Sequence, residues 1–222
     1  MHIPDGYLDP AIIAITWAVT IPFLIFAWKK TKTTYNHATA ATLAVSSALV
    51  FVVQLINFPV AGGASSVHIL GGTFLAIILG PFAAMLSMTT VLMMQAFFFA
   101  DGGLLAFGAN AFNMAVIGGL SFFIVQLLMK KSAGRSRFAS SVLIASWSAT
   151  VLTALLTGLE LGFSSAFAAA GGITLTVPTM FSVYVVAGLV EAVLTAGLAV
   201  SLRQWQPGVV LGLKLLGRRG EL

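Results

Sequence analysis

The sequence predicts an all-α, polytopic membrane protein: a compact bundle of about seven transmembrane helices forming one domain over residues 1–222. The chain is 59% hydrophobic and only 8% charged, about a third of the charge that soluble domains carry. Its mean hydropathy is +1.04. Apolar runs close to the length of a bilayer span recur along it. This composition excludes a soluble enzyme and a disordered chain, and the absence of cysteine excludes a disulfide scaffold.

Seven apolar runs follow one another along the chain. They cover Ala11–Trp28, His37–Ile56, Ile69–Leu79, Phe82–Phe99, Ala109–Met129, Phe138–Leu159 and Leu175–Leu202. The third run is the exception in length, because its residues rise only about 16 Å, roughly half a bilayer. It stops at Gly80-Pro81, a helix-breaking pair. We expect a half-span buried among its neighbours, where Gly71, Gly72 and Gly80 permit close backbone contact.

The basic residues set the orientation. When the seven runs alternate across the membrane, all 11 Lys and Arg residues fall on one side: Lys29, Lys30, Lys32, Lys130, Lys131, Arg135, Arg137, Arg203, Lys214, Arg218 and Arg219. The opposite side carries Asp5, Asp9, Asp101 and Glu160. Because positively charged loops stay cytoplasmic, we expect the N-terminus outside and the C-terminus in the cytoplasm. Residues 1–10 then form an extracellular segment. They lack a basic n-region, so we expect no cleavable signal peptide and a retained Met1.

The remaining polar side chains gather at the outer ends of the predicted helices. They are Gln54, Asn57, Ser65, Ser66, His68, Gln95, Asp101, Asn110 and Asn113. Polar groups at membrane depth usually face a bundle interior or a cavity, so their clustering predicts one outward-facing polar pocket. For any single Asn or Gln, capping a helix end is an equally good interpretation.

The N-terminal residues Met1-His2-Ile3-Pro4-Asp5-Gly6 carry a sharper signal. The Met1 α-amine, the His2 backbone amide and the His2 Nδ1 can close two fused chelate rings around one metal ion. Such rings hold three nitrogens nearly in a plane, which suits Ni(II) or Cu(II). His68 is the other outer-side histidine and supplies a fourth nitrogen. His37 lies beside the inner lysines, and we interpret it as an ordinary interfacial residue.

These residues resemble a known family. The start Met1-His2-Ile3-Pro4-Asp5-Gly6-Tyr7-Leu8 resembles that of the CbiM/NikM proteins, the substrate-binding S-components of energy-coupling factor (ECF) transporters for cobalt and nickel. Further similar segments are Asn57-Phe58-Pro59-Val60, Ser66-Val67-His68-Ile69-Leu70-Gly71-Gly72, Leu79-Gly80-Pro81, Asp101-Gly102-Gly103-Leu104-Leu105, Gly108-Ala109-Asn110, Asn113-Met114-Ala115 and Gly188-Leu189-Val190-Glu191-Ala192. Together they cover nearly the whole chain in order. Val67 departs from the family pattern, which has Gly before the histidine.

The resemblance implies that Ni(II) or Co(II), the transported substrate, is held by the Met1 amine, the His2 amide and imidazole, and the His68 imidazole. It also implies that the N-terminal segment folds into the bundle. Four planar nitrogens and the seven-helix form favour nickel over cobalt. Asn57, Ser66, Gln95, Asp101, Asn110 and Asn113 are then candidates to surround the ligands.

The resemblance also implies partners in a prokaryotic inner membrane: two ABC-type ATPases, a transmembrane T-component and often a small accessory membrane protein. The chain itself has no G-x-x-x-x-G-K-[ST] phosphate loop, so ATP hydrolysis is expected in the partners. Ala40, Ala44 and Ala48 repeat every four residues and share one side of the second helix. This side is either a docking face for the T-component or a close packing surface inside the protein.

Four alternatives compete with this interpretation. A cobalt-specific S-component serving cobalamin synthesis uses the same family features. A stand-alone secondary metal permease typically needs acidic or histidine residues through the membrane depth, where only Glu191 lies, and the role of Glu191 stays open. A copper carrier is suggested by methionines at 85, 88, 93, 94 and 114, but nitrogen donors disfavour Cu(I). An intramembrane hydrolase lacks a nucleophile and base pair, because there is no Cys and no His at depth.

Overall fold

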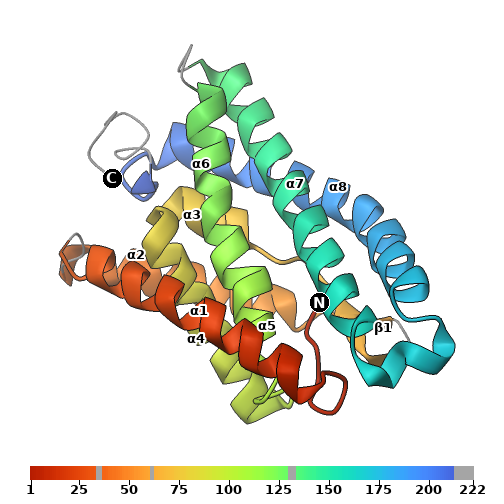
Figure 1. The fold of residues 1–222 in the computed structure, drawn as a ribbon. Coiled ribbons are helices and arrows are strands. Elements are labelled where there is room, and N and C mark those ends of the chain that lie inside the picture. The colour runs from red at the N-terminus through yellow and green to blue at the C-terminus, as the bar shows by residue number, and fades with distance from the viewer. Residues whose placement is uncertain (34–36, 61–62, 130–133, 213–222) are drawn as a thin grey trace.

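The computed structural model describes residues 1–33, 37–60, 63–129 and 134–212. Over these residues the protein is an all-α membrane protein with eight α-helices (Figure 1). They are α1 (Pro10–Thr31), α2 (His37–Gln54), α3 (Gly72–Leu79), α4 (Pro81–Phe99), α5 (Phe107–Asn110), α6 (Ile117–Met129), α7 (Arg135–Gly162) and α8 (Ile173–Trp205). A π-helical segment, Ala111–Val116, joins α5 to α6, and a 3₁₀ turn, Ser165–Ala170, precedes α8.

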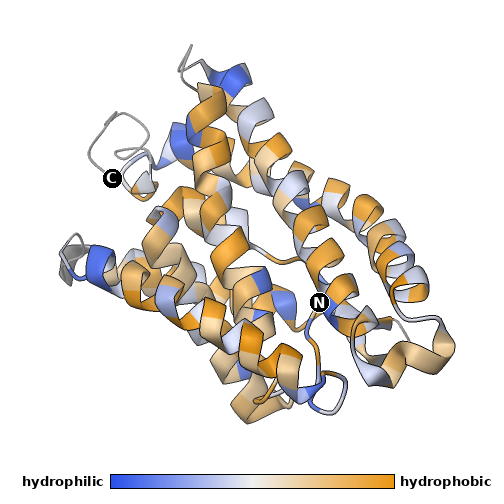
Figure 2. Cartoon of the chain, viewed as in Figure 1, coloured by the Kyte–Doolittle hydropathy of each residue, from blue (hydrophilic) through white to orange (hydrophobic). Residues whose placement is uncertain are grey.

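Each predicted apolar run coincides with a helix. Within the described ranges, five helical stretches are long and apolar enough to cross a membrane: Pro10–Thr31, Pro81–Phe99, Phe107–Met129, Arg135–Gly162 and Ile173–Trp205. The apolar part of α2, Thr39–Gln54, is shorter. Large apolar side chains such as Ile15, Phe98 and Trp205 are 63%, 71% and 79% exposed. Figure 2 shows hydrophobic residues along most of the length of the helices. A surface of this kind is stable against lipid rather than water.

The third predicted run forms α3, a short helix whose residues are all buried. Its expected close packing is confirmed at Gly72, where a Cβ would lie 2.8 Å from the Cα of Gly118 in α6. The flanking glycines have another role. Gly71 and Gly80 adopt φ of +75° and +80°, values that side chains disfavour. Gly80 therefore turns the chain directly into Pro81, the first residue of α4.

A two-stranded antiparallel hairpin, which was not predicted from the sequence, lies between α2 and α3. Its strands are β1 (Phe58–Val60) and β2 (Ser65–Val67), with Phe58 paired to Val67 and Val60 to Ser65. Three-residue strands give almost no periodic signal in a sequence. The hairpin matters because β2 leads directly into His68.

The alanine face of α2 is open to the outside. Ala40, Ala44 and Ala48 are all exposed, so the interpretation that they pack inside this protein is wrong. Five of the basic residues used to predict the membrane orientation lie outside the described residues: Lys130, Lys131, Lys214, Arg218 and Arg219. The same holds for the side chain of His37.

Candidate metal centre

The N-terminal segment, residues 1–9, lies folded into the bundle. Met1, His2 and Ile3 are only 1%, 2% and 0% exposed. Asn110 of α5 holds the Ile3 backbone in two directions: its Oδ1 accepts from the Ile3 N–H at 2.8 Å, and its Nδ2 donates to the Ile3 carbonyl at 2.9 Å. The Gly103 N–H donates to the same carbonyl. These contacts fix the backbone directly after His2.

Two aspartates anchor the rest of the segment. The Asp5 carboxylate accepts hydrogen bonds from the N–H groups of Leu104, Leu105 and Ala106, at 3.0, 2.8 and 3.0 Å, just before α5. Asp9 accepts from the hydroxyl and the N–H of Ser165 at 2.6 and 2.9 Å. These two hydrogen bonds lower the pKa of Asp9. The segment is thus held at its middle and at its end.

The Met1 α-amine donates hydrogen bonds to the Ser66 carbonyl and to the Ser66 Oγ, the latter at 2.9 Å. Burial lowers the pKa of this amine well below its usual value, because the charged form loses its hydration. The carboxylates of Asp101 and Glu191 oppose that shift in part. An amine must be neutral to bind a metal, so the surroundings favour its ligating form.

The His2 side chain is oriented by Gln95 of α4, whose Oε1 lies 3.1 Å from His2 Nε2. A carbonyl oxygen only accepts, so Nε2 carries the proton and Nδ1 keeps a free lone pair. That Nδ1 lies 3.2 Å from Asp101 Oδ1. Burial lowers the pKa of His2 and favours the neutral ring. Two lone pairs thus face each other, an arrangement that a proton or a metal ion would stabilise.

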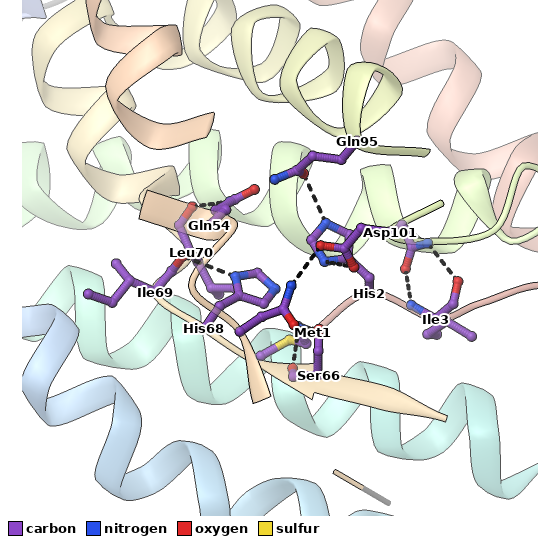
Figure 3. Close-up of polar contacts among 12 residues, drawn as sticks. Met1, His2, Ile3, Gln54, Ser66, His68, Ile69, Leu70, Gln95 and Asp101 are labelled. Atoms are coloured by element: carbon purple, nitrogen blue, oxygen red, sulfur yellow. Dashed lines mark hydrogen bonds and ion pairs between the residues drawn. The ribbon is translucent and has the colours of Figure 1, made fainter. Parts of the chain in front are cut away.

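His68 presents a second free lone pair. Its Nδ1 donates to the Ile69 carbonyl at 3.0 Å, and its Nε2 is buried without a hydrogen-bond partner among the described residues. Burial lowers the pKa of His68 as well, and the nearby N-terminal amine and His2 add to that shift. The rings of His2 and His68 stack with centroids 4.7 Å apart (Figure 3). Buried polar atoms without partners are rare, so His68 Nε2 is a candidate ligand atom.

The structure gathers most of the predicted surrounding residues at this point. Ser66, Gln95, Asp101 and Asn110 contact the N-terminal residues as described above, and Asn57 donates to Asp101 Oδ2 at 2.9 Å. Asn113 differs, because its amide donates to Thr157 and Glu160 of α7, at 3.2 and 2.6 Å. No group of three or more His, Cys, Asp or Glu side chains suited to a metal occurs in the described part of the chain. The candidate donors are therefore mainly the N-terminal nitrogens and His68.

Of the three side chains that hold the backbone around His68, Tyr184 and Glu191 were not predicted as site residues, and Gln54 was predicted only as part of the outer polar pocket. Tyr184 of α8 donates to the Ser66 carbonyl at 2.5 Å, and Gln54 of α2 donates to the Leu70 carbonyl at 2.5 Å. Glu191 of α8 accepts from the backbone after His68. The depth of Glu191 in an apolar helix was the one signal available.

A helical membrane bundle with two buried histidines beside a buried amine is compatible with one class of protein, a membrane component that transports a transition metal. Comparison with known proteins agrees. Residues 2–209 match the CbiM family, described as the cobalt uptake substrate-specific transmembrane region. The chain belongs to this family. It is a cobalt/nickel uptake transmembrane component, a multi-pass membrane transporter of prokaryotes and not an enzyme.

Several relatives are similar over most of the chain. A putative metal transport protein of Haloquadratum walsbyi is 35% identical, over 95% of this chain and 93% of the relative. The fused nickel transport protein NikMN of Rhodobacter capsulatus is 36% identical, over 93% of this chain and 63% of its own length. The cobalt transport protein CbiM of Lachnoclostridium phytofermentans is 32% identical, over 89% and 82%. A crystal structure of a transition metal transporter is 34% identical with a TM-score of 0.83, over 99% of this chain and 100% of that one.

Proposed function

We propose that this chain is the S-component of an ECF-type importer and binds Ni(II) with high affinity. The ligands are the Met1 amine, the His2 amide nitrogen, the His2 Nδ1 and the His68 Nε2. The observation that carries the proposal is the buried His68 Nε2, which has no hydrogen-bond partner among the described residues, beside a His2 ring whose Nδ1 is left free by Gln95. Burying two neutral imidazoles and an amine side by side is unusual for groups with a purely structural role, so we interpret their nitrogens as metal donors.

Nickel is favoured over cobalt by the donor set. A chelate of amine, amide and imidazole holds its nitrogens nearly in a plane, and planar nitrogen coordination suits Ni(II). The relatives do not decide between the metals, because both nickel and cobalt transport proteins are among them. Co(II) is therefore the competing substrate in the test.

The orientation and the partners belong to the same proposal. The described basic residues lie at the helix ends away from the N-terminus: Lys29 and Lys30 in the last turn of α1 and Lys32 directly after it, Arg135 and Arg137 at the start of α7, and Arg203 in the last turn of α8. This arrangement supports a cytoplasmic C-terminus and an outward-facing metal site. Two ATPases then drive reorientation through a T-component, which docks on the exposed alanine face of α2.

The test is a competition titration on the purified protein, carrying a C-terminal tag so that the Met1 amine is free. We expect one Ni(II) per chain, bound more tightly than Co(II), with the visible absorption of planar Ni(II). Tighter binding of Co(II), or an octahedral nickel spectrum, would contradict the nickel assignment. Metal uptake into vesicles that contain this chain alone would favour the stand-alone permease.

A further inference from the structure

The loop that carries His68 sets the direction of its ring. We call residues Ser66–Gly71 the His68 loop. The hydrogen bond of the His68 ring is to the carbonyl of Ile69, which is part of the same loop. Nε2 has no partner of its own within the described structure. The position of Nε2 therefore follows the backbone of the loop, and whatever fixes that backbone also fixes the candidate ligand.

Two buried side chains hold this backbone from different helices. Glu191 of α8 accepts from the Leu70 N–H at 3.0 Å and from the Gly71 N–H at 2.9 Å. Gln54 of α2 donates to the Leu70 carbonyl at 2.5 Å. Leu70 is thus held at both its N–H and its carbonyl (Figure 3 shows Gln54 beside Leu70). Glu191 and Gln54 are 2% and 0% exposed, so water does not compete for these bonds.

The third contact of the Glu191 carboxylate is to Thr150 of α7, whose hydroxyl donates to Glu191 Oε2 at 3.2 Å. All these neighbours are donors, which suits a carboxylate that acts as an acceptor for the loop. On the other side of His68, Tyr184 donates to the Ser66 carbonyl. Tyr184 and Glu191 are two turns apart, so they share one face of α8. This face of α8 contacts the His68 loop on both sides of the histidine.

We propose that Glu191, together with Gln54, is a positioning residue that holds the His68 loop so that Nε2 meets the N-terminal donors. This role rests on the proposed function, because it requires His68 to be a ligand. Glu191 acts on the metal through the backbone of Leu70 and Gly71, not by direct contact. An amide at position 191 presents N–H groups to one of these backbone donors, so the loop shifts and the ligand geometry loosens.

The experiment is a double-mutant cycle with Ni(II) as the probe. The four proteins are the wild type, Glu191→Gln, His68→Ala and the double variant, all with a free N-terminus. We expect Glu191→Gln to weaken Ni(II) binding by about 10- to 100-fold, as for other residues that orient metal ligands. In the His68→Ala background the same change should cost less than about twofold, because residues that act through one another are not additive. The nickel absorption of Glu191→Gln should shift toward that of His68→Ala.

Two further variants provide a control and an independent second test. Glu160→Gln changes another carboxylate of an apolar helix, which contacts Asn113 and not the His68 loop, and we expect wild-type affinity. Gln54→Met removes the donor to the Leu70 carbonyl at similar volume and should repeat the non-additive loss. Thermal unfolding of each metal-free variant establishes that it is folded. If Glu191→Gln does not fold, the Gln54→Met cycle decides by the same criterion.

The outcomes separate the two proposals. Wild-type affinity in Glu191→Gln would overturn the positioning role, while the ligand set would stand. An equal loss in both backgrounds would also overturn it, because a direct electrostatic effect of the Glu191 charge does not depend on His68. Wild-type affinity in His68→Ala, or no metal binding by the wild type, would instead refute the proposed function.

Discussion

An extension of the N-terminus by one residue tests the most distinctive ligand. Placing a glycine before Met1 keeps every side chain of the site and turns the Met1 amine into an amide. An amide nitrogen has no basic lone pair until it loses its proton, so one of four donors is lost. We expect the extended protein to lose high-affinity Ni(II) binding.

The magnitude follows from the surroundings of Met1. Replacing a residue that merely orients a ligand costs 10- to 100-fold in metal affinity, so removal of a ligand atom should cost at least about 100-fold, or about 2.8 kcal/mol. There is a steric contribution as well. Met1 is 1% exposed and its nitrogen contacts both the carbonyl and the hydroxyl of Ser66. An added residue must displace packed atoms in order to fit.

The assay compares nickel affinity and nickel content of the extended protein with those of the same chain tagged only at its C-terminus. Mass spectrometry establishes that the extension is intact, and thermal unfolding of the metal-free proteins establishes that both are folded. Affinity of the extended protein within about twofold of the unextended one would refute the amine as a ligand. The planar argument for nickel would then fail too.

The other predictions concern His68, the pH dependence of nickel binding, the hydrogen bonds of Asp5 and the alanine face of α2. His68→Ala should abolish high-affinity nickel binding in a folded protein, and retained wild-type stoichiometry would contradict it. Nickel affinity should rise about tenfold per pH unit above neutral, because binding releases the His2 amide proton. It should fall more steeply in acid, where protons also occupy the amine and the imidazoles; because burial lowers the pKa of these groups, the steeper fall begins below their usual pKa values. Nickel affinity that stays flat from pH 8 to 5 would argue for carboxylate ligands. Asp5→Ala removes three backbone hydrogen bonds and should speed nickel dissociation, measured by chelator chase, while an unchanged rate would show that the anchor is dispensable. Ala44→Leu should leave nickel binding intact and reduce copurification with the T-component, and normal copurification would place the docking face elsewhere.

The helices could be predicted because each has its own apolar signal. Even α3 was predicted as a short, buried element, since its length and the following Gly80-Pro81 are local features. The hairpin could not be predicted, because its strands are too short to show a period. The Ala40 face could be placed on one side of α2, but only the neighbouring helices decide whether that side is covered.

The candidate site could be predicted from the sequence where its groups belong to consecutive residues. The proposed chelate of Met1 and His2 uses atoms of consecutive residues, so it can be inferred from the sequence alone. Glu191 could not be assigned, because its partner Leu70 is 121 positions away and offers only its backbone. Asn113 was expected at the pocket as one of the polar residues at the outer ends of the predicted helices, about one turn after Asn110. The π-helical segment adds a residue to that turn and directs Asn113 toward α7.

The contact between Gly72 and Gly118 has a consequence for movement. Each glycine lies where a Cβ would be 2.8 Å from the other's Cα, so α3 and α6 touch at a point that admits only hydrogen. If one helix slid along the other, the residue three positions further on the same face, Leu75 in α3 or Ser121 in α6, would bring a side chain into that point. This close contact therefore opposes sliding of α3 along α6. Because the His68 loop runs directly into α3, we expect the loop, α3 and α6 to move together in the proposed reorientation.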